Sequence, residues 1–200
     1  MFKNDYFGGM KNILLVLLIL PLISFSQRHK EIVDTSRYTI FPEENKEVLY
    51  TGVVNVDSNL KKDELYVRAR AWFVNEYKSA KDVIQMEDKQ AGEIIGKGLI
   101  SAIYTEGRGL LAIQWKITIW HTVSVFVKDG KYKYEIKDIN GSYYSETFHE
   151  ERPWNIGNKY ISYYNQKYYV PFLNSVDEKF KQIISDLNSA MNAPLKNKDW

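Results

Sequence analysis

Apolar and polar residues alternate over an unusually long stretch in the middle of the chain. From residue 111 to residue 127 the odd positions are apolar apart from His121, and the even positions are mostly polar. Period-two alternation is typical of a strand with one buried face. A strand of this length exceeds the usual range, so the pattern predicts a bend or bulge near Trp120 and His121, where the alternation is weakest.

The pair Asp129-Gly130 ends this stretch and predicts a hairpin turn. Tyr132, Tyr134 and Ile136 then line one face of a returning strand. A type I′ turn is favoured for such a pair, because both of its central residues must tolerate positive φ angles.

Three further segments have the composition of strands. They are residues 48–56, the short segment 83–86, and residues 91–104, which contain three glycines. Glycines inside a strand indicate twist, a bulge or the close approach of another backbone. The chain is therefore expected to form one early strand and, later, four strands in a meander.

Two segments show helical spacing instead. Leu65, Ala69 and Trp72 recur along one side of the first, and most charged residues fall on the other side. The second carries a continuous apolar stripe, and Ser175 with Glu178 three residues later predicts a capping box at its start. The stripe consists of Leu173, Val176, Phe180, Ile183, Ile184, Leu187 and Met191.

The predicted order of elements is therefore strand, helix, four strands and helix. This order predicts an α+β domain of two layers, in which two helices cover one face of an antiparallel sheet and leave the other face available. We place the domain at residues 47–192, after an extended lead-in at 27–46 and before a flexible tail at 193–200.

The N-terminal 26 residues have the pattern of a cleavable signal peptide. Lys11 precedes an apolar run at residues 13–20, which is shorter than the about 20 residues that a membrane-spanning helix needs. The small residues Ser24 and Ser26 predict cleavage between Ser26 and Gln27. The mature protein is then expected in the periplasm or at the cell surface, without a stable membrane span.

Composition argues against several classes of function. Removal of the signal segment leaves 25 of the 27 basic and 24 of the 25 acidic residues, so the mature chain is nearly neutral. Such a balance provides no long-range field, and nucleic acid is not expected as a partner. The chain contains no cysteine, which rules out disulfides, thiol catalysis and anchoring through a lipid-modified cysteine.

Several short motifs resemble a known family in their sequence and order. They are Asp63-Glu64-Leu65-Tyr66, Ala71-Trp72-Phe73, Asp82-Val83-Ile84-Gln85, the segment from Ala91 to Gly98, and the segment from Val127 to Tyr132. Together they resemble a family of exported, uncharacterised bacterial proteins described as a domain of unknown function with a TATA-binding-protein-like fold. The resemblance covers about residues 48–139, and the C-terminal helix by topology. The resemblance implies a fold and an envelope location. It provides no basis for inferring an activity or nucleic-acid binding, because a fold does not define a function.

The segment from Ser142 to Tyr169 is rich in aromatic residues and poor in aliphatic ones. Tyrosine and tryptophan combine a large apolar area with a polar group and are frequent at recognition surfaces, so this segment is the candidate binding surface. An equally good interpretation is a lid, or an added hairpin around Asn165-Gln166, that buries its own rings. The candidate residues are Tyr143, Tyr144, Trp154, Tyr160, Tyr163, Tyr164, Tyr168 and Tyr169.

Three other features suggest chemistry but have simpler interpretations. The segment from Gly92 to Gly98 lacks the spacing of a phosphate-binding loop, and strand curvature or close packing explains its glycines better. His121 shares the parity of the apolar positions, which predicts a hydrogen-bonded core histidine. His149 with Glu150 and Glu151 offers metal-ligand types, but adjacent loop residues seldom converge on one ion, so neither a metal nor another cofactor is expected.

Three functional hypotheses follow from these observations. The first is a non-enzymatic module that binds an envelope protein or a glycan through the open sheet face and the tyrosine-rich segment. The second is an envelope hydrolase that uses His121 or His149 with a nearby carboxylate. The third is a structural subunit that pairs with a neighbour through an open sheet edge.

Overall fold

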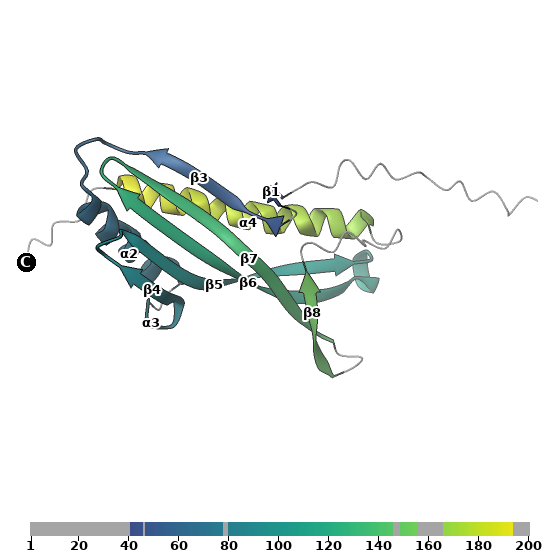
Figure 1. Cartoon of the computed structure of the whole chain (residues 1–200). Helices are drawn as coiled ribbons and strands as arrows, with labels where there is room; N and C mark the ends of the chain where they lie inside the picture. The colour runs from purple at the N-terminus through teal and green to yellow at the C-terminus, as the bar shows by residue number, and fades with distance from the viewer. Residues whose placement is uncertain (1–40, 46, 78–79, 146–148, 156–165, 194–200) are drawn as a thin grey trace, which may run out of the picture. The chain divides into compact units, whose positions relative to one another are not determined.

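One antiparallel sheet forms the centre of the described structure. The computed structural model describes residues 41–45, 47–77, 80–145, 149–155 and 166–193. The sheet has the strand order β3-β7-β6-β5-β4, and β8 also pairs with β7 (Figure 1). Its strands are β3 (Tyr50–Asn55), β4 (Ile84–Asp88), β5 (Glu93–Glu106), β6 (Ile113–Lys128), β7 (Lys131–Ser145) and β8 (Glu150–Asn155).

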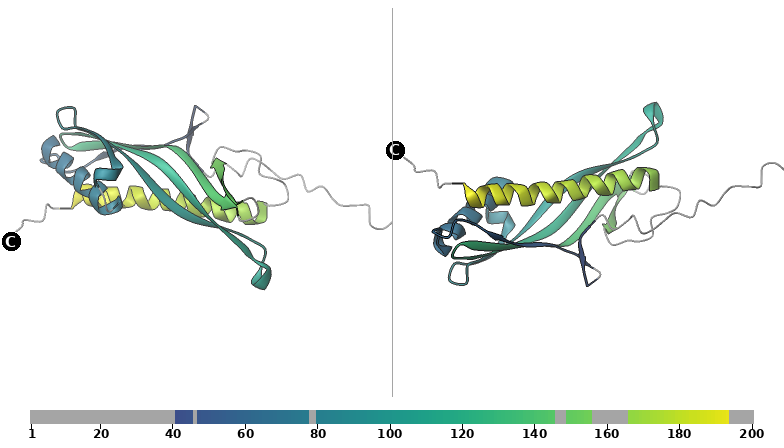
Figure 2. Two further views of the ribbon diagram at one scale, coloured as in Figure 1. Left: turned by 90° about the horizontal axis from the view of Figure 1, so that it is seen from below. Right: turned by 90° about the horizontal axis from the view of Figure 1, so that it is seen from above.

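Two long helices lie on the same face of this sheet (Figure 2). They are α2 (Lys62–Tyr77) and α4 (Gln166–Asn192), and the shorter α3 (Ala80–Val83) and the 3-10 helix η3 (Gly109–Leu111) complete the helical elements described. The ring of His121 in β6 contacts both long helices, through Tyr77 of α2 and Phe180 of α4. The α+β architecture of two layers predicted from the sequence is therefore confirmed, with the other sheet face left uncovered by helix.

The core lies between the helices and the covered face. Leu65, Ala69 and Phe73 of α2 and Val176 and Phe180 of α4 are fully buried there. They pack over the odd-numbered residues of β6, as the period-two pattern predicted. Burial of a large apolar side chain contributes about 1.5–3 kcal/mol, so this layer dominates the stability of the fold.

A bulge interrupts the β6–β7 pairing at the place where the sequence pattern is weakest. The register shifts between Trp120 and Thr122, which pair with Asn140 and Lys137. The extra residue lies in β7, and Asp138 there has a φ of 56°. A bulge shifts the side-chain parity by one residue. As a result, even positions of β7 face the core before the bulge and odd positions do so after it.

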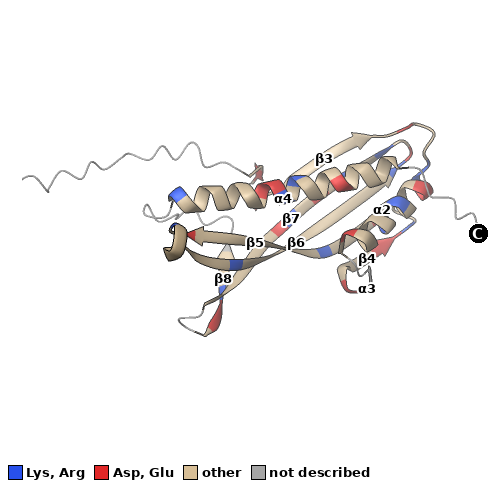
Figure 3. Ribbon diagram, turned by 180° about the vertical axis from the view of Figure 1, so that it is seen from behind, with Lys and Arg blue, Asp and Glu red and all other residues tan. Residues whose placement is uncertain are grey.

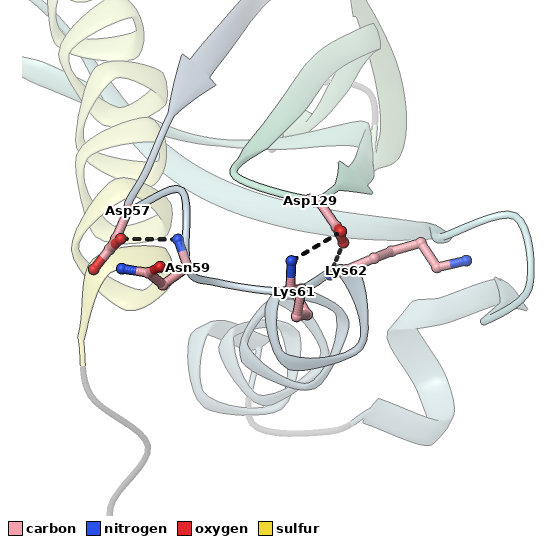
Figure 4. A network of polar contacts seen from close by, with 5 residues as sticks. All are labelled: Asp57, Asn59, Lys61, Lys62 and Asp129. Atoms are coloured by element: carbon pink, nitrogen blue, oxygen red, sulfur yellow. Dashed lines mark hydrogen bonds and ion pairs between the residues drawn. The ribbon is translucent and has the colours of Figure 1, made fainter.

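The turn between β6 and β7 also caps α2 (Figure 4). Asp129 Oδ1 accepts a hydrogen bond of 2.8 Å from the backbone N–H of Lys62, and Oδ2 lies 3.5 Å from Lys61 Nζ. This bond satisfies a free N–H at the helix start and lowers the pKa of Asp129. The type I′ turn predicted from Asp129-Gly130 is wrong, because only Gly130 has a positive φ, of 70°. The turn also contacts the segment just before α2, where the Gly130 N–H donates a hydrogen bond to the carbonyl of Leu60.

Helix α4 begins earlier than the sequence pattern predicted. It starts at Gln166 and continues through Pro171. The predicted capping box at Ser175 is wrong, because Ser175 lies inside the helix and its hydroxyl donates to the carbonyl of Phe172. The additional turns are supported by aromatic packing, since the Phe172 ring contacts those of Tyr104 and Trp154.

Two buried polar contacts hold α4 against the rest of the domain. The Tyr50 hydroxyl donates to Asp177 Oδ1 at 2.8 Å, and Arg68 Nη1 donates to the carbonyl of Met191 at 2.7 Å. The second contact places a guanidinium at the C-terminal end of α4, where free carbonyls favour a positive charge. Burial raises the pKa of Tyr50, and its bond to Asp177 acts in the same direction.

The described chain begins with a small element that the sequence did not suggest. Strand β1 (Glu43–Glu44) pairs with β2 (Glu47–Val48), and the preceding Phe41 is buried in the core. Residues 41–45 thus already contribute to the folded structure, within the segment expected as an extended lead-in. The signal segment and the C-terminal tail from residue 194 lie outside the described residues. Nowhere in the described part is a helix both long and apolar enough to cross a membrane.

Candidate functional site

The uncovered face of the sheet carries a group of exposed apolar side chains. We define the open-face patch as Leu99 and Ile103 of β5, Trp120 of β6 and Tyr144 of β7. Their exposed fractions are 58%, 58%, 46% and 47%. Leu99 and Trp120 are direct partners in the ladder, so their side chains lie next to each other on this face.

Small polar side chains accompany the open-face patch. Ser101, Thr118 and Ser142 form a row across β5, β6 and β7. The hydroxyl of Ser142 donates to Glu151 of β8. Asn140 pairs with Trp120 on the next strand. The row runs between the Leu99–Trp120 pair and the residues Ile103 and Tyr144, so the patch consists of two apolar groups separated by hydroxyl side chains.

Charges on the open face are mixed in sign. Lys116 pairs with Ile103 inside the patch, and farther along the face Glu135 pairs with Lys133 and Lys137. On the side of α4, Figure 3 shows basic and acidic residues scattered over the described elements. This mixture of signs agrees with the near-neutral composition.

Two of the predicted aromatic site residues pack against the core, Trp154 as a buried and Tyr169 as a half-buried side chain. Trp154 of β8 is buried, packs on Phe172 and donates its indole N–H to the Tyr169 hydroxyl at 3.0 Å. The Tyr169 ring in turn contacts Tyr104 and Phe172. These contacts attach β8 and the start of α4 to the core, which matches the packing interpretation of the tyrosine-rich segment.

The remaining predicted residues divide between the two faces or lie outside the described structure. Tyr144 is exposed on the open face, whereas Tyr143 pairs with Ile117 on the covered face and is half-buried. Tyr168, in the first turn of α4, is half-buried beside Lys167. Tyr160, Tyr163 and Tyr164 fall in residues 156–165, which are not described. The suggested hairpin around Asn165-Gln166 is wrong, because Gln166 begins α4 and the added hairpin is formed by β7 and β8.

His121 is a core histidine, as its parity predicted. Its Nε2 lies 2.9 Å from the Tyr77 hydroxyl, and its ring is nearly perpendicular to that of Phe180. Burial lowers the pKa of His121 to about 4, although the backbone carbonyl of Ile119 opposes this shift. A neutral ring enclosed by aromatic side chains cannot reach a substrate in solution. The described contacts of His121 also include no carboxylate that could orient it for catalysis.

The glycines of β5 serve close packing. A Cβ on Gly96 would come within 2.7 Å of the Phe73 ring, and a Cβ on Gly98 would collide with Tyr77 and His121. The aromatic face of α2 can therefore approach the sheet only where β5 has no side chain. His149 is exposed at the turn before β8, and the described residues contain no group of three acidic or histidine side chains that could hold a metal ion.

Sequence reasoning missed most of the open-face patch. Leu99 and Ile103 are apolar residues at positions that alternate with the buried residues of β5, and Trp120 is apolar at an even position of β6. These exceptions to the alternation were the available signal. The weak alternation at Trp120 marks an exposed tryptophan as well as the position of the bulge.

Comparison with known proteins supports the fold. Residues 50–142, from the start of β3 into β7, match DUF4468, described as a domain of unknown function with a TBP-like fold. The family resemblance seen in the sequence motifs is thereby confirmed over this region. No curated protein matches the sequence.

Two solved structures share the architecture. A DUF4468 family protein from Bacteroides ovatus aligns with a TM-score of 0.55 and 17% identity, over 82% of this chain and 98% of the other. A TBP-like protein from Parabacteroides distasonis aligns with a TM-score of 0.54 and 17% identity, over 74% of this chain and 97% of the other. At this identity the likeness concerns the fold alone.

Proposed function

We propose that this DUF4468-like chain is an exported, non-enzymatic binding module that holds a partner protein on its open sheet face. The open-face patch is the observation that supports this proposal. It presents Leu99, Ile103, Trp120 and Tyr144 on the side of the sheet that neither long helix covers. Exposed apolar groups surrounded by polar residues are characteristic of protein interaction surfaces.

The form of the surface favours a macromolecular partner over a small ligand. Small-molecule sites are concave and enclose most of their ligand, whereas the patch lies on the face of an extended sheet. A hollow lies elsewhere, on the outer side of α2 near Tyr66, Arg70 and Lys89. Tryptophan and tyrosine are enriched among the residues that contribute most to protein interfaces, so Trp120 is the expected centre of the contact.

Export is the second part of the proposal and rests on the sequence. A basic residue, a short apolar run and small residues before Gln27 form the pattern of a signal peptide. Expression of the full sequence followed by mass spectrometry of the purified protein tests this part, since cleavage at the expected site gives a chain that begins at Gln27.

Site-specific cross-linking tests the binding role. A photoreactive residue replaces Leu99 in the full chain, and a matched probe replaces Val67, an exposed apolar residue on α2. Any protein captured through position 99 but not 67 is then purified and titrated against the unmodified chain. Trp120→Ala should weaken that complex by about tenfold or more, as for the central residue of an interface, while Val67→Ala leaves it unchanged.

Other outcomes would overturn the binding role of this face. Equal capture through positions 99 and 67, or a complex that Trp120→Ala does not weaken, would show that the open-face patch is not the binding surface. Capture only by probes in the edge strand β4 would favour the structural subunit that pairs through a sheet edge.

A further inference from the structure

The distal end of the β5–β6 hairpin carries the two most exposed large apolar side chains of the described residues. Leu110 and Leu111, in η3 at its end, are 106% and 86% exposed. Ile113, on β6 just behind them, is 58% exposed. We define these three residues as the hairpin tip. Two adjacent leucines with almost complete exposure are unfavourable in water and indicate a contact that removes them from it.

The hairpin tip projects from the rest of the described domain. Ile113 pairs with Glu106 and is the first apolar residue of β6 behind the leucines. The end of the hairpin stands clear of α4 in both views of Figure 2. A projecting end with two exposed leucines can enter a fluid apolar phase without a matching surface on a partner.

A group of amphipathic rings lies immediately behind the hairpin tip. Tyr104 of β5 stacks on Trp115 of β6 with ring centroids 5.3 Å apart, and Tyr169 of α4 contacts Tyr104 at 6.0 Å. Tyrosine and tryptophan concentrate at the boundary between lipid and water. Trp115 follows Leu111 by only a few residues, which at about 3.3 Å per strand residue places the rings roughly 13 Å behind the leucines, on the water side of the acyl region.

The charges near the hairpin tip are mixed, so attraction to anionic lipid is not the main contribution. Arg108 precedes η3, Glu106 ends β5, Lys116 follows Trp115, and Lys167 lies in the first turn of α4. The cationic side chains are long enough to reach headgroups while their aliphatic parts stay near the apolar region. Binding driven by apolar burial should depend little on salt.

We propose that the hairpin tip inserts into the interface of a lipid bilayer and holds the domain on a membrane surface. Leu110 and Leu111 enter the acyl region from the end of the hairpin, Ile113 follows, and the rings of Tyr104 and Trp115 lie at the headgroup level. This role uses different residues from the open-face patch. It therefore adds a membrane contact to the proposed protein contact and does not depend on it.

Flotation with phosphatidylcholine vesicles tests the insertion. The protein produced from the full sequence should float with the vesicles, and the partition should persist at high salt. Leu110→Ser combined with Leu111→Ser should lower the partition coefficient by about 100-fold, since losing the burial of each leucine costs about tenfold or more. Val67→Ser, which removes an exposed apolar side chain on α2 outside the open-face patch, is the matched control and should change the partition less than about threefold. Circular dichroism confirms that each variant is folded.

A fluorescent label gives a second measurement on the intact fold. Because the chain has no cysteine, Leu110→Cys provides a single attachment point for an environment-sensitive dye. Its emission should shift to shorter wavelength when vesicles are added, whereas a dye on Val67→Cys should not respond.

Three results would overturn the proposal. One is the absence of flotation together with an unchanged spectrum of the dye at position 110. Another is binding only to phosphatidylglycerol vesicles that salt abolishes, which would indicate surface charge without insertion. The third is a dimer in solution that the double serine variant dissociates, which would assign the hairpin tip to a contact between copies of this chain.

Discussion

The two faces of the β5–β6 hairpin carry similar apolar side chains in opposite environments. Ile119 and Val123 are fully buried beneath the helices, whereas Leu99 and Trp120 on the reverse side are about half exposed. The hairpin itself does not cause this difference in exposure, since side chains recur with the same period of two residues on both of its faces. The difference comes from the helices, which remove one face from water and leave the other free. Side chains of similar hydrophobicity therefore stabilise the fold on one face and are available for binding on the other.

The comparison predicts that the largest loss of stability follows from a truncation beneath α4. Phe180 contacts Tyr50 and His121 and is fully buried. Phe180→Ala should lower the free energy of unfolding by about 3–5 kcal/mol, because it removes buried area and leaves a cavity. Urea denaturation measures this loss, and a change of less than about 1 kcal/mol would show that the covered face is not the core.

A second, smaller loss is expected on acidification, because His121 is buried in its neutral form. Its pKa in the folded protein is about 4, below the ordinary 6.5, so the unfolded chain takes up this proton first. The stabilisation by the neutral ring is complete above pH 6.5 and is lost as the pH falls toward 4, by about 3 kcal/mol in all. Urea denaturation from pH 7 to pH 4 should show a shallower dependence for His121→Gln than for the unchanged protein. Equal slopes would contradict the burial of a neutral ring.

The smallest effect is expected on the open face. Leu99→Ala removes an apolar side chain that water already reaches, so the free energy of unfolding should change by only about 0.5 kcal/mol. The same urea titration as for Phe180→Ala makes the two values directly comparable. A loss of 2 kcal/mol or more would mean that the open face is covered by another part of the protein, and the proposed binding surface would then be internal.

Sequence patterns predicted the helices and strands better than they predicted which side chains are exposed. The alternation in β6 and the apolar stripe of α4 were recognisable because a one-sided core imposes a period on the chain. The aromatic residues of the tyrosine-rich segment have no such period, and their composition alone could not assign a side. Trp154 is buried and Tyr169 half-buried because β8 pairs with the sheet beside the first turns of α4, whereas Tyr144 is exposed.

The sequence by itself determined the two-layer α+β architecture, the meander, the bulge near Trp120 and the burial of His121. These features follow from local periods and from glycine positions, which short segments of chain already contain. Tertiary structure alone decided the capping of α2 by Asp129, the geometry of the turn at Gly130, the early start of α4 and the exposure of Leu110 and Leu111. Each of these depends on residues that are distant in sequence but adjacent in space, or on how far the helices extend along the sheet, and no local pattern contains that information.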